Sequence, residues 1–393
     1  MSSTFSTQPA AEPTDLVIIG SGIVGLAHAY HAHRRGLTVR VIERDSRPNG
    51  ASIRNFGHCC ITAQHGDLLD TAYRSREGWL QAANDIGFWA PDSGAYVVAR
   101  SEKEMAVVEE MALDRGTDAV KLLGVDGIRA ALGGNPDPAI VGGAHLPADL
   151  RVDPRTTAGE IADWLQRQDG VHFEWSTSVR DVGQGTVSTS RGEFRGGKVV
   201  VCVGHDMDYL FPELAARYQV QRCALQMALA TAPDEFTQDG AILTGTSMTR
   251  YDGFTSQPSA AAVREEIYGH SPELIDMVAN VMFARRPDGT VLLGDSHVYG
   301  STVDPFLDDW WTDRLVGEIG KVLGTQLNVT QRWQGVYANS PLTSLLIDEV
   351  DDQTRVVTVT SGIGMTLSFG IGAEGIDSLF PSSRELRTVT SGS

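Results

Sequence analysis

Residues 15–25 read Asp-Leu-Val-Ile-Ile-Gly-Ser-Gly-Ile-Val-Gly, and this stretch decides which fold the chain can adopt. Asp15 to Ile19 is a short apolar run that ends at glycine, which predicts a buried strand. Ile23 to Arg35 has the pattern of a helix, and Gly36 ends it. Thr38 to Glu43 is a second strand-like run. A strand, a helix and a strand in this order form a βαβ unit, which predicts a parallel sheet.

The glycines between the first strand and the helix have the Gly-x-Gly-x-x-Gly spacing of a dinucleotide-binding turn. Gly20 permits the tight turn, Gly22 lets the backbone approach a pyrophosphate, and Gly25 lets the helix pack on the sheet. The start of a helix offers free N–H groups to phosphate, and Glu43 can bind ribose hydroxyls. The alternative is a glycine-rich turn without a ligand, which the flanking strands and helix disfavour. The expected contacts of the dinucleotide in this region are Gly20, Gly22, Ile23, Val24, Gly25, Glu43 and Arg44.

Three further stretches resemble the D-amino-acid oxidase, glycine oxidase and sarcosine oxidase superfamily. Gly50-Ala51-Ser52-Ile53-Arg54-Asn55-Phe56-Gly57-His58 resembles its second signature, which passes the pyrophosphate and the flavin ring. Val199 to Gly204 resembles its mid-chain strand, and Ser361 to Thr366 resembles the glycine turn that opens its last helix. A helix dipole at that place stabilises negative charge on a reduced flavin. The resemblance implies FAD and adds these expected contacts: Ser52, Arg54, Asn55, Val179, Gly204, Gly362, Gly364, Met365 and Thr366.

The order of the elements predicts an α/β fold with a Rossmann-like FAD-binding domain and a mixed, mostly antiparallel-sheet substrate domain. Lys198 to Val203 is a continuous apolar run, so the parallel sheet resumes there. Val171 to Val182 and Thr186 to Phe194 are expected to be antiparallel strands, and Asp288-Gly289 predicts a hairpin. The expected FAD-binding domain comprises residues 14–75, 150–212 and 330–385, and the substrate domain comprises residues 76–149 and 213–329.

The composition is that of an ordinary globular protein, with 41% hydrophobic and 21% charged residues. The net charge of −18 disfavours nucleic acid and anionic membranes as partners. No apolar run is long enough to predict a transmembrane helix. The four cysteines lack C-x-x-C spacing, so we expect neither a disulfide framework nor a metal site, and a cytoplasmic location fits.

The substrate region resembles a subgroup linked to aminophosphonate breakdown, which is thought to oxidise small amines such as aminoethylphosphonate derivatives. The resemblance lies in residues 52–58, 222–227 and 293–299. Glycine and D-amino-acid oxidases hold the substrate carboxylate with an arginine in the late strand, and the matching residue here is Tyr337. Because tyrosine offers no planar fork for a carboxylate, this difference disfavours an ordinary α-amino acid.

The resemblance also indicates that FAD is bound without a covalent link. The cysteine that monomeric sarcosine oxidases use near the late strand is absent. Arg54 stands about where the dimethylglycine dehydrogenases place their linking histidine. No lysine lies in a stretch expected over the ring, so a cation that activates oxygen would be a histidine or an arginine.

Five residues are the candidates for substrate chemistry, and for four of them a purely structural role is the alternative. His58 follows the flavin signature and either faces the ring or caps a strand. His297 and Tyr299 follow a strand end and either face the ring or lie in a solvated turn. Arg222 either holds an anionic headgroup or forms a surface ion pair. We expect His58, Tyr337 and His297 to be catalytic and Arg222 and Tyr299 to bind substrate.

The expected reaction is oxidation of a small primary or secondary amine, such as 2-aminoethylphosphonate or its N-methyl derivative. A hydride passes to the flavin, water hydrolyses the imine, and molecular oxygen is the expected acceptor, giving hydrogen peroxide. The alternatives are a glycine, sarcosine or D-amino-acid oxidase, and an amine dehydrogenase with another acceptor. A flavin-bound subunit without turnover is a further alternative from another class.

Overall fold

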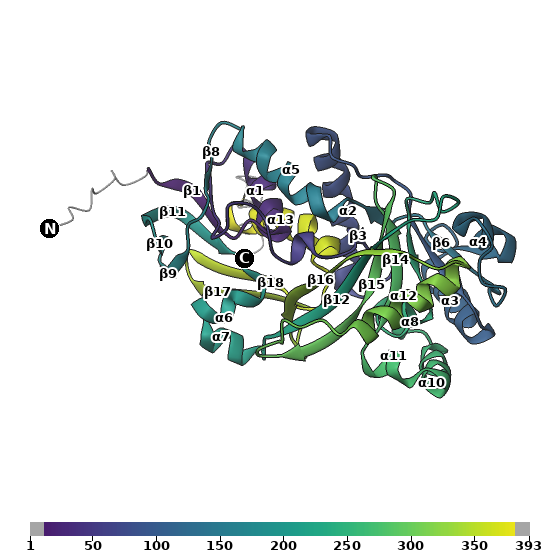
Figure 1. Ribbon diagram of the computed structural model, residues 1–393. Coiled ribbons are helices and arrows are strands. Elements are labelled where there is room, and N and C mark those ends of the chain that lie inside the picture. The colour runs from purple at the N-terminus through teal and green to yellow at the C-terminus, as the bar shows by residue number, and fades with distance from the viewer. Residues whose placement is uncertain (1–11, 382–393) are drawn as a thin grey trace, which may run out of the picture.

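The computed structural model describes residues 12–381 as two eight-stranded sheets that lie side by side, with helices packed on them (Figure 1). The label β1 marks the sheet on the left of the view, and the label β15 marks the sheet to its right. A two-stranded sheet of β3 (His58–Cys59) and β7 (Leu150–Arg151) is separate from both. Among the described residues, no helix is both long enough and apolar enough to cross a membrane.

The first sheet has the strand order β17-β18-β11-β1-β2-β8, and β10 and β9 extend from β11. The predicted βαβ unit is confirmed, since β1 pairs in parallel with both β2 and β11. Its strands are β1 (Thr14–Ile19), β2 (Val39–Ile42), β8 (Val171–Glu174), β9 (Val179–Gly183), β10 (Thr186–Thr189), β11 (Gly192–Val201), β17 (Leu345–Asp351) and β18 (Thr354–Val359).

One expected pairing in this sheet is wrong. Residues 171–174 do not join the antiparallel strands β9 and β10 but pair in parallel with β2. The residues from Trp175 to Ser178 break the run, and Ser176 has a positive φ of 52°. The apolar pattern of residues 171–174 suits pairing with β2 as well as with β10, so the pattern alone does not predict the partner strand. The turn at Ser176 separates these residues from β9 and leaves them paired with β2.

Helices cover one face of the first sheet and bury its apolar side. Their core includes Leu16, Tyr30, Trp79 and Phe369. The helices on this sheet are α1 (Ile23–Arg34), α2 (Asp67–Ile86), α5 (Pro154–Gln166) and α13 (Gly364–Leu379), with α6 (Met207–Leu210) and α7 (Pro212–Arg217) elsewhere on it.

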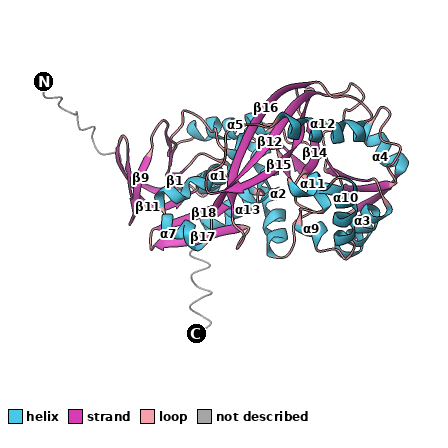
Figure 2. Cartoon of the chain, turned by 60° about the horizontal axis from the view of Figure 1, so that its bottom comes forward, coloured by secondary structure: helices cyan, strands magenta, loops and turns pink. Residues whose placement is uncertain are grey.

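The second sheet has the order β16-β12-β15-β14-β13-β4-β6-β5, and every pair except β13 with β4 is antiparallel. Its long strands β12, β15 and β16 run diagonally across the middle of Figure 2. The predicted hairpin at Asp288-Gly289 is confirmed, since it joins β14 and β15. The strands are β4 (Ala95–Ala99), β5 (Lys121–Gly124), β6 (Gly142–Leu146), β12 (Gln221–Thr231), β13 (Ala241–Leu243), β14 (Asn280–Arg285), β15 (Thr290–Gly300) and β16 (Val329–Asn339).

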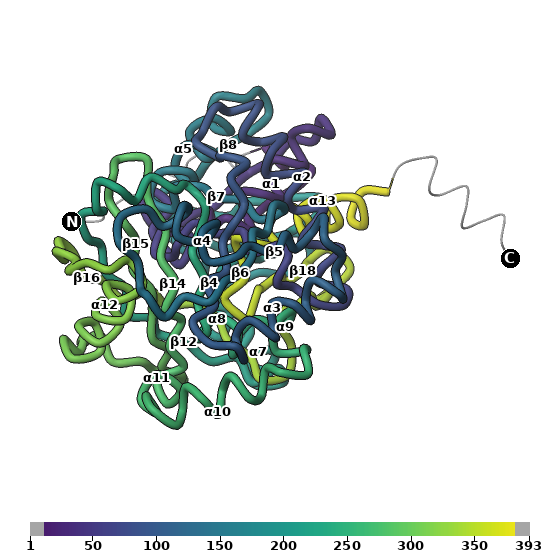
Figure 3. Tube along the Cα trace, turned by 90° about the vertical axis from the view of Figure 1, so that its right-hand side faces the viewer, coloured from purple at the N-terminus to yellow at the C-terminus, as the bar shows by residue number. Residues whose placement is uncertain are grey.

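Strand β16 pairs with β12, so residues 329–339 belong to the second sheet, and the chain re-enters the first sheet at β17. The segment expected for the FAD-binding domain begins at residue 330, within this strand. Helices α10, α11 and α12 lie away from α1, α2 and α5 in the end view of Figure 3. The helices of this part are α3 (Glu102–Arg115), α4 (Val125–Leu132), α8 (Gly245–Met248), α9 (Asp252–Thr255), α10 (Ala260–His270), α11 (Pro272–Asp276) and α12 (Asp309–Leu323).

Candidate functional site

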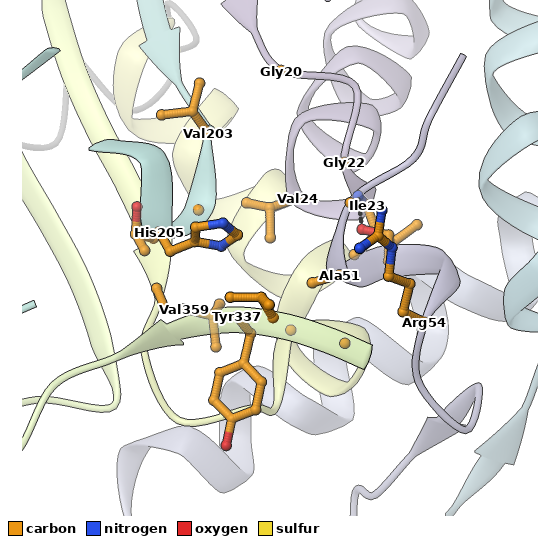
Figure 4. A pocket seen from close by; sticks show the side chains of 18 of the residues that line it. Gly20, Gly22, Ile23, Val24, Ala51, Arg54, Val203, His205, Tyr337 and Val359 are labelled. Atoms are coloured by element: carbon orange, nitrogen blue, oxygen red, sulfur yellow. Dashed lines mark hydrogen bonds between the residues drawn. The ribbon is translucent and has the colours of Figure 1, made fainter. Parts of the chain in front are cut away.

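One cavity of about 440 Å³ extends from the glycine turn after β1 to the inner face of the second sheet. Figure 4 looks into it, with Gly20 and Gly22 on one side of the view and Tyr337 on the other. Fourteen of the expected cofactor contacts line it: Gly20, Gly22, Ile23, Val24, Glu43, Arg44, Ser52, Arg54, Asn55, Val179, Gly204, Gly362, Gly364 and Met365. The cavity therefore collects residues from all three predicted segments of the FAD-binding domain.

Two expected contacts lie behind the cavity wall. A side chain at Gly25 would meet the Gly20 carbonyl oxygen at 2.1 Å, so this glycine permits the close packing of helix on turn. The Thr366 hydroxyl accepts a hydrogen bond from the Cys60 N–H at 3.0 Å. Both residues shape the wall and do not line it.

The nucleotide end of the cavity depends on a turn that only glycine fits. Gly20 has a φ of 99°, and a Cβ there would lie 2.6 Å from the Cys202 carbonyl oxygen. Helix α1 begins without a side-chain cap at Gly22, although the Ser52 hydroxyl accepts a hydrogen bond from the Ile23 N–H at 2.8 Å. The remaining free N–H groups of this helix start are available for phosphate.

Glu43 serves the turn as well as the cavity. Its Oε2 accepts hydrogen bonds from the N–H and hydroxyl of Ser21, both at 2.8 Å, and its Oε1 accepts one from the Asp45 N–H at 2.9 Å. A carboxylate has about four acceptor positions, so roughly one stays free for a ribose hydroxyl. The carboxylate therefore supports the glycine turn directly.

The far end of the cofactor region is the start of α13. This helix has no side-chain cap at Ile363, and Gly364 and Met365 line the cavity. Gly362 has a φ of 76°, and a Cβ there would lie 3.0 Å from Cζ of Tyr337 and 3.3 Å from Nη2 of Arg250. The helix start thus lies directly beside the inner face of the second sheet.

Strand register explains which side chains face this region. Tyr299, Cys223 and Tyr337 stand opposite one another on β15, β12 and β16. His297, Leu225 and Gly335 form the next row along the same strands. Because side chains two residues apart share a face of a strand, the two rows lie on one face of the sheet. Tyr337, Leu225 and His297 line the cavity, whereas Tyr299 does not line it and is 40% exposed.

An arginine that no sequence pattern singled out completes this end of the cavity. Arg250, between α8 and α9, lines the cavity and donates a hydrogen bond from Nη2 to the Tyr337 hydroxyl at 3.0 Å. Burial acts to lower its pKa, but the oxygens of Tyr337, Asp295 and Tyr251 outweigh burial and raise the pKa above its ordinary value. A planar, permanently charged fork is therefore present although the late strand carries tyrosine.

Asp295 and His297 lie on β15 beside this arginine. Both line the cavity and both are 4% exposed. Burial raises the pKa of Asp295 to about 7, which Arg250 partly opposes. Burial, and then the charge of Arg250, lower the pKa of His297 well below its usual value. Nδ1 of His297 lies 2.8 Å from the carbonyl oxygen of Val278, so the neutral ring donates there and leaves Nε2 as an acceptor.

His58 forms a buried pair with Asp149. Its Nε2 lies 2.8 Å from Oδ2 of Asp149, and Oδ1 accepts a hydrogen bond from the Thr62 N–H at 2.8 Å. His58 also lines the cavity, and its Nδ1 has no hydrogen-bond partner in the part of the chain that is described. The pair with Asp149 therefore fixes His58 in the wall of the cavity.

The same pair lies near a thiol, so a metal site has to be considered. His58, Asp149 and Cys60 offer ligand atoms that lie within 4.8 Å of one another. Burial raises the pKa of the Cys60 thiol well above its ordinary value, and the carboxylate is already held by two hydrogen bonds. These groups suit a hydrogen-bonded pair, and the absence of a metal site stays a prediction.

Arg222 lies on the second sheet outside the cavity lining. Its guanidinium donates to Asp208 at 2.8 and 3.1 Å and reaches Asp206 at 3.5 Å. Its charge is thus already paired, whereas Arg250 lines the cavity beside Tyr337. Asp295 could have been found by its alternation with His297 and Tyr299, but Arg250 follows a short helix in no recognisable pattern.

The residues present fit a flavin dinucleotide. Two uncapped helix starts face one cavity, one beside the glycine turn of Gly20 and one beside Gly364. The first suits a pyrophosphate, and the second suits a ring that becomes negative on reduction. The inner face of the second sheet closes the same cavity beside the second helix start, which leaves a polar chamber for a substrate.

Comparison with known proteins agrees with this geometry. The model of a family described as "FAD dependent oxidoreductase" (DAO) matches residues 15–377. The D-amino acid dehydrogenase of Vibrio atlanticus (strain LGP32) is 25% identical over 255 residues, which are 48% of this chain and 61% of that protein. The D-amino acid dehydrogenase of Vibrio vulnificus (strain YJ016) is 23% identical over 374 residues, which cover 71% of this chain and 87% of that protein.

Among solved structures, glycine oxidase from Geobacillus kaustophilus has a TM-score of 0.74 at 17% identity, covering 94% of this chain and 95% of that one. At this identity the likeness shows the fold alone. It confirms the predicted α/β fold class. The match to the Vibrio atlanticus protein leaves more than a third of that protein's length unmatched.

Proposed function

The chain belongs to the DAO family of FAD-dependent oxidoreductases, and on that premise we propose that it oxidises a small amine that carries an acidic group. The observation that carries the proposal is Arg250, a cavity-lining guanidinium that is hydrogen-bonded to Tyr337 beside the start of α13. A half-buried cation that faces a chamber favours an anion there, because an unpaired charge in a water-poor site is costly.

In this proposal FAD, held without a covalent link, supplies the acceptor for a hydride from the carbon next to the substrate nitrogen. Arg250 binds the acidic group, and the Tyr337 hydroxyl holds the guanidinium in place. His297 stays neutral, because burial and Arg250 disfavour its charged form. It therefore offers an acceptor nitrogen to the substrate. The walls formed by Leu225, Met282 and Val336 limit water in the chamber.

Two substrate classes fit an acidic amine. An amino acid is supported by Arg250, which supplies the fork that Tyr337 lacks, and by relatives named D-amino acid dehydrogenase and glycine oxidase. An aminophosphonate such as 2-aminoethylphosphonate is the second candidate. The motif resemblance of residues 293–299 supports it, although none of those names refers to aminophosphonates. In this proposal, tyrosine at position 337 does not disfavour amino acids, because Arg250 supplies the guanidinium from elsewhere in the chain.

The electron acceptor is proposed to be molecular oxygen, with a dehydrogenase that uses another acceptor as the alternative. The names of the relatives support both, since they include an oxidase and dehydrogenases. The cation needed near the flavin for oxygen activation is again Arg250. Its side chain lies close to Gly362 at the turn before α13.

The test is a peroxide-release screen with purified, yellow protein. Glycine, sarcosine, D-alanine, 2-aminoethylphosphonate and N-methyl-2-aminoethylphosphonate are supplied in air at equal concentration. Peroxide from at least one of them supports an amine oxidase. Bleaching of the flavin without oxygen, but no peroxide in air, supports a dehydrogenase. No bleaching by any of them contradicts the proposal and favours a subunit without turnover. Acid precipitation should release FAD into the supernatant, and colour retained in the pellet would contradict non-covalent binding.

A further inference from the structure

A buried carboxylate in the substrate chamber has an oxygen with no protein partner. Asp295 is 4% exposed and lines the same cavity as Arg250. Among the described residues, its Oδ1 has no hydrogen-bond partner. Leaving a buried acceptor unsatisfied is costly, so such an atom at a binding site indicates a ligand that satisfies it.

The surroundings of Asp295 do not neutralise it. Its one ion-pair contact within the described chain is with Nε2 of His297 at 3.8 Å, and burial holds that ring neutral. Arg250 is near enough to act on its charge but forms no salt bridge with it in the same part of the chain. Arg250 and the carboxyl group of Asp295 thus lie in one chamber without forming an ion pair with each other in the described part of the chain.

We propose that Asp295 binds the amino group of the substrate and accepts its proton, so that the chamber selects molecules with both an ammonium and an acidic group. The inference rests on the proposed function and deepens it. Arg250 holds the acidic end, and Oδ1 of Asp295 accepts a hydrogen bond from the nitrogen. Two oppositely charged anchors fix the orientation of the carbon between them, which is the carbon to be oxidised.

The proton step balances without any further reactant. An ammonium has no lone pair, so hydride loss from the adjacent carbon cannot form a C=N bond until one N–H proton leaves. That proton moves from the nitrogen to a carboxylate oxygen of Asp295, and the electron pair of the N–H bond stays on nitrogen. No electrons leave the substrate in this step.

Several groups on neighbouring elements influence the charge of Asp295. Arg250 and Tyr251 approach from the connection between α8 and α9, and Asn280 is its strand partner on β14. Asn280 is committed, since its Oδ1 accepts from Ser247 and its Nδ2 donates to Tyr251. His297 and Tyr337 also line the chamber, and Tyr299 and Cys223 lie beside Tyr337 in the same row of the sheet.

The first experiment compares two probes that the flavin cannot oxidise. Neither 2-aminoisobutyrate nor 2-hydroxyisobutyrate has a hydrogen on the carbon next to the carboxylate, and only the first has an amine. Binding to the holoenzyme is followed by the change in flavin absorbance. The wild type should bind the amine probe at least 10-fold more tightly, and Asp295→Asn should reduce that ratio to about 1. Arg250→Gln should weaken both probes together.

Asp304→Asn makes the same chemical change at an exposed position after β15 and should leave the ratio intact. An Asp295→Asn variant with normal flavin content and an unchanged ratio overturns the inference. If the wild type binds neither probe, 2-aminoethylphosphonate and 2-hydroxyethylphosphonate without oxygen replace them. Binding of none of the four also overturns it.

The second experiment uses the wild type and does not depend on any variant folding. Because burial raises the pKa of Asp295 to about 7, part of the free enzyme carries a proton there at pH 7. Calorimetry of 2-aminoisobutyrate binding in two buffers of different ionisation enthalpy should therefore show proton release at pH 7 and none at pH 9. Equal proton release at both pH values overturns the inference. If an acidic amine bleaches the flavin but one of these two experiments fails, only the role of Asp295 is refuted and the proposed function remains. If no acidic amine bleaches the flavin, the proposed function is refuted as well.

Discussion

Replacing Arg250 by glutamine should remove the preference for acidic amines while leaving amines without an acidic group little affected. A charge-assisted hydrogen bond to an anion contributes about 1.5–3 kcal/mol. At about 1.4 kcal/mol per factor of ten, its loss lowers kcat/KM for an acidic amine by about 10- to 150-fold. The smaller figure applies if one N–H group of the guanidinium binds the acid, because the structure commits Nη2 to the Tyr337 hydroxyl at 3.0 Å.

The assay measures kcat/KM for an acidic amine, for example glycine, against ethylamine, which is similar in size but has no acidic group. Arg250→Lys keeps the charge and loses the fork, so it should fall between the wild type and Arg250→Gln. Arg222→Lys tests the competing assignment, since the sequence predicts that Arg222 binds the anion, whereas the structure pairs it with Asp208. Equal losses for glycine and ethylamine in Arg250→Gln, or a selective loss in Arg222→Lys, would refute the role of Arg250.

Three further perturbations test the cavity. Gly362→Ala should lower kcat by at least 10-fold with little loss of secondary structure, because φ is 76° and the new Cβ would lie 3.0 Å from Tyr337. Circular dichroism measures the secondary structure, and a normal kcat would contradict the close approach. Glu43→Ala should raise the Kd of FAD by about 5- to 150-fold, since about 1–3 kcal/mol of hydrogen bonding is lost; an unchanged Kd contradicts it. Burial raises the pKa of Asp295 from 3.8 to about 7 in the folded protein. The contribution of this group to the free energy of unfolding is therefore fully present below pH 3.8 and is lost as the pH rises through 7. Asp295→Asn should therefore raise the Tm of substrate-free protein at pH 8 and change it little at pH 4, and equal shifts at both pH values contradict this.

The nucleotide half of the molecule could be predicted because its chemistry is local in sequence. Gly20, Gly22 and Glu43 lie within one βαβ unit, and the backbone geometry of that unit dictates their residue types. The start of α13 is similarly marked by Gly362 and Gly364. Each of these motifs satisfies a requirement of the chain segment in which it stands.

The substrate half could be predicted only in part, because its side chains meet through tertiary packing. The sequence placed His297 and Tyr299 after a strand end, whereas both lie within β15 (Thr290–Gly300). The register of the strands then decides that Tyr337 stands across Cys223 from Tyr299. Arg250 comes from a connection between two short helices and reaches the place of the missing arginine from another direction. Matching the late strand to that of the related oxidases finds Tyr337 at this position and does not reveal Arg250.

The central claim is that a flavin in this cavity oxidises amines that carry an acidic group. The most direct measurement mixes the purified holoenzyme, without oxygen, with glycine, D-alanine, 2-aminoethylphosphonate or ethylamine at equal concentration and follows the yellow absorbance of the flavin. The account predicts that at least one of the three acidic amines bleaches the flavin and that ethylamine does so at least 10-fold more slowly. A flavin that stays oxidised with all three acidic amines, or that ethylamine reduces as fast as the best of them, would contradict it.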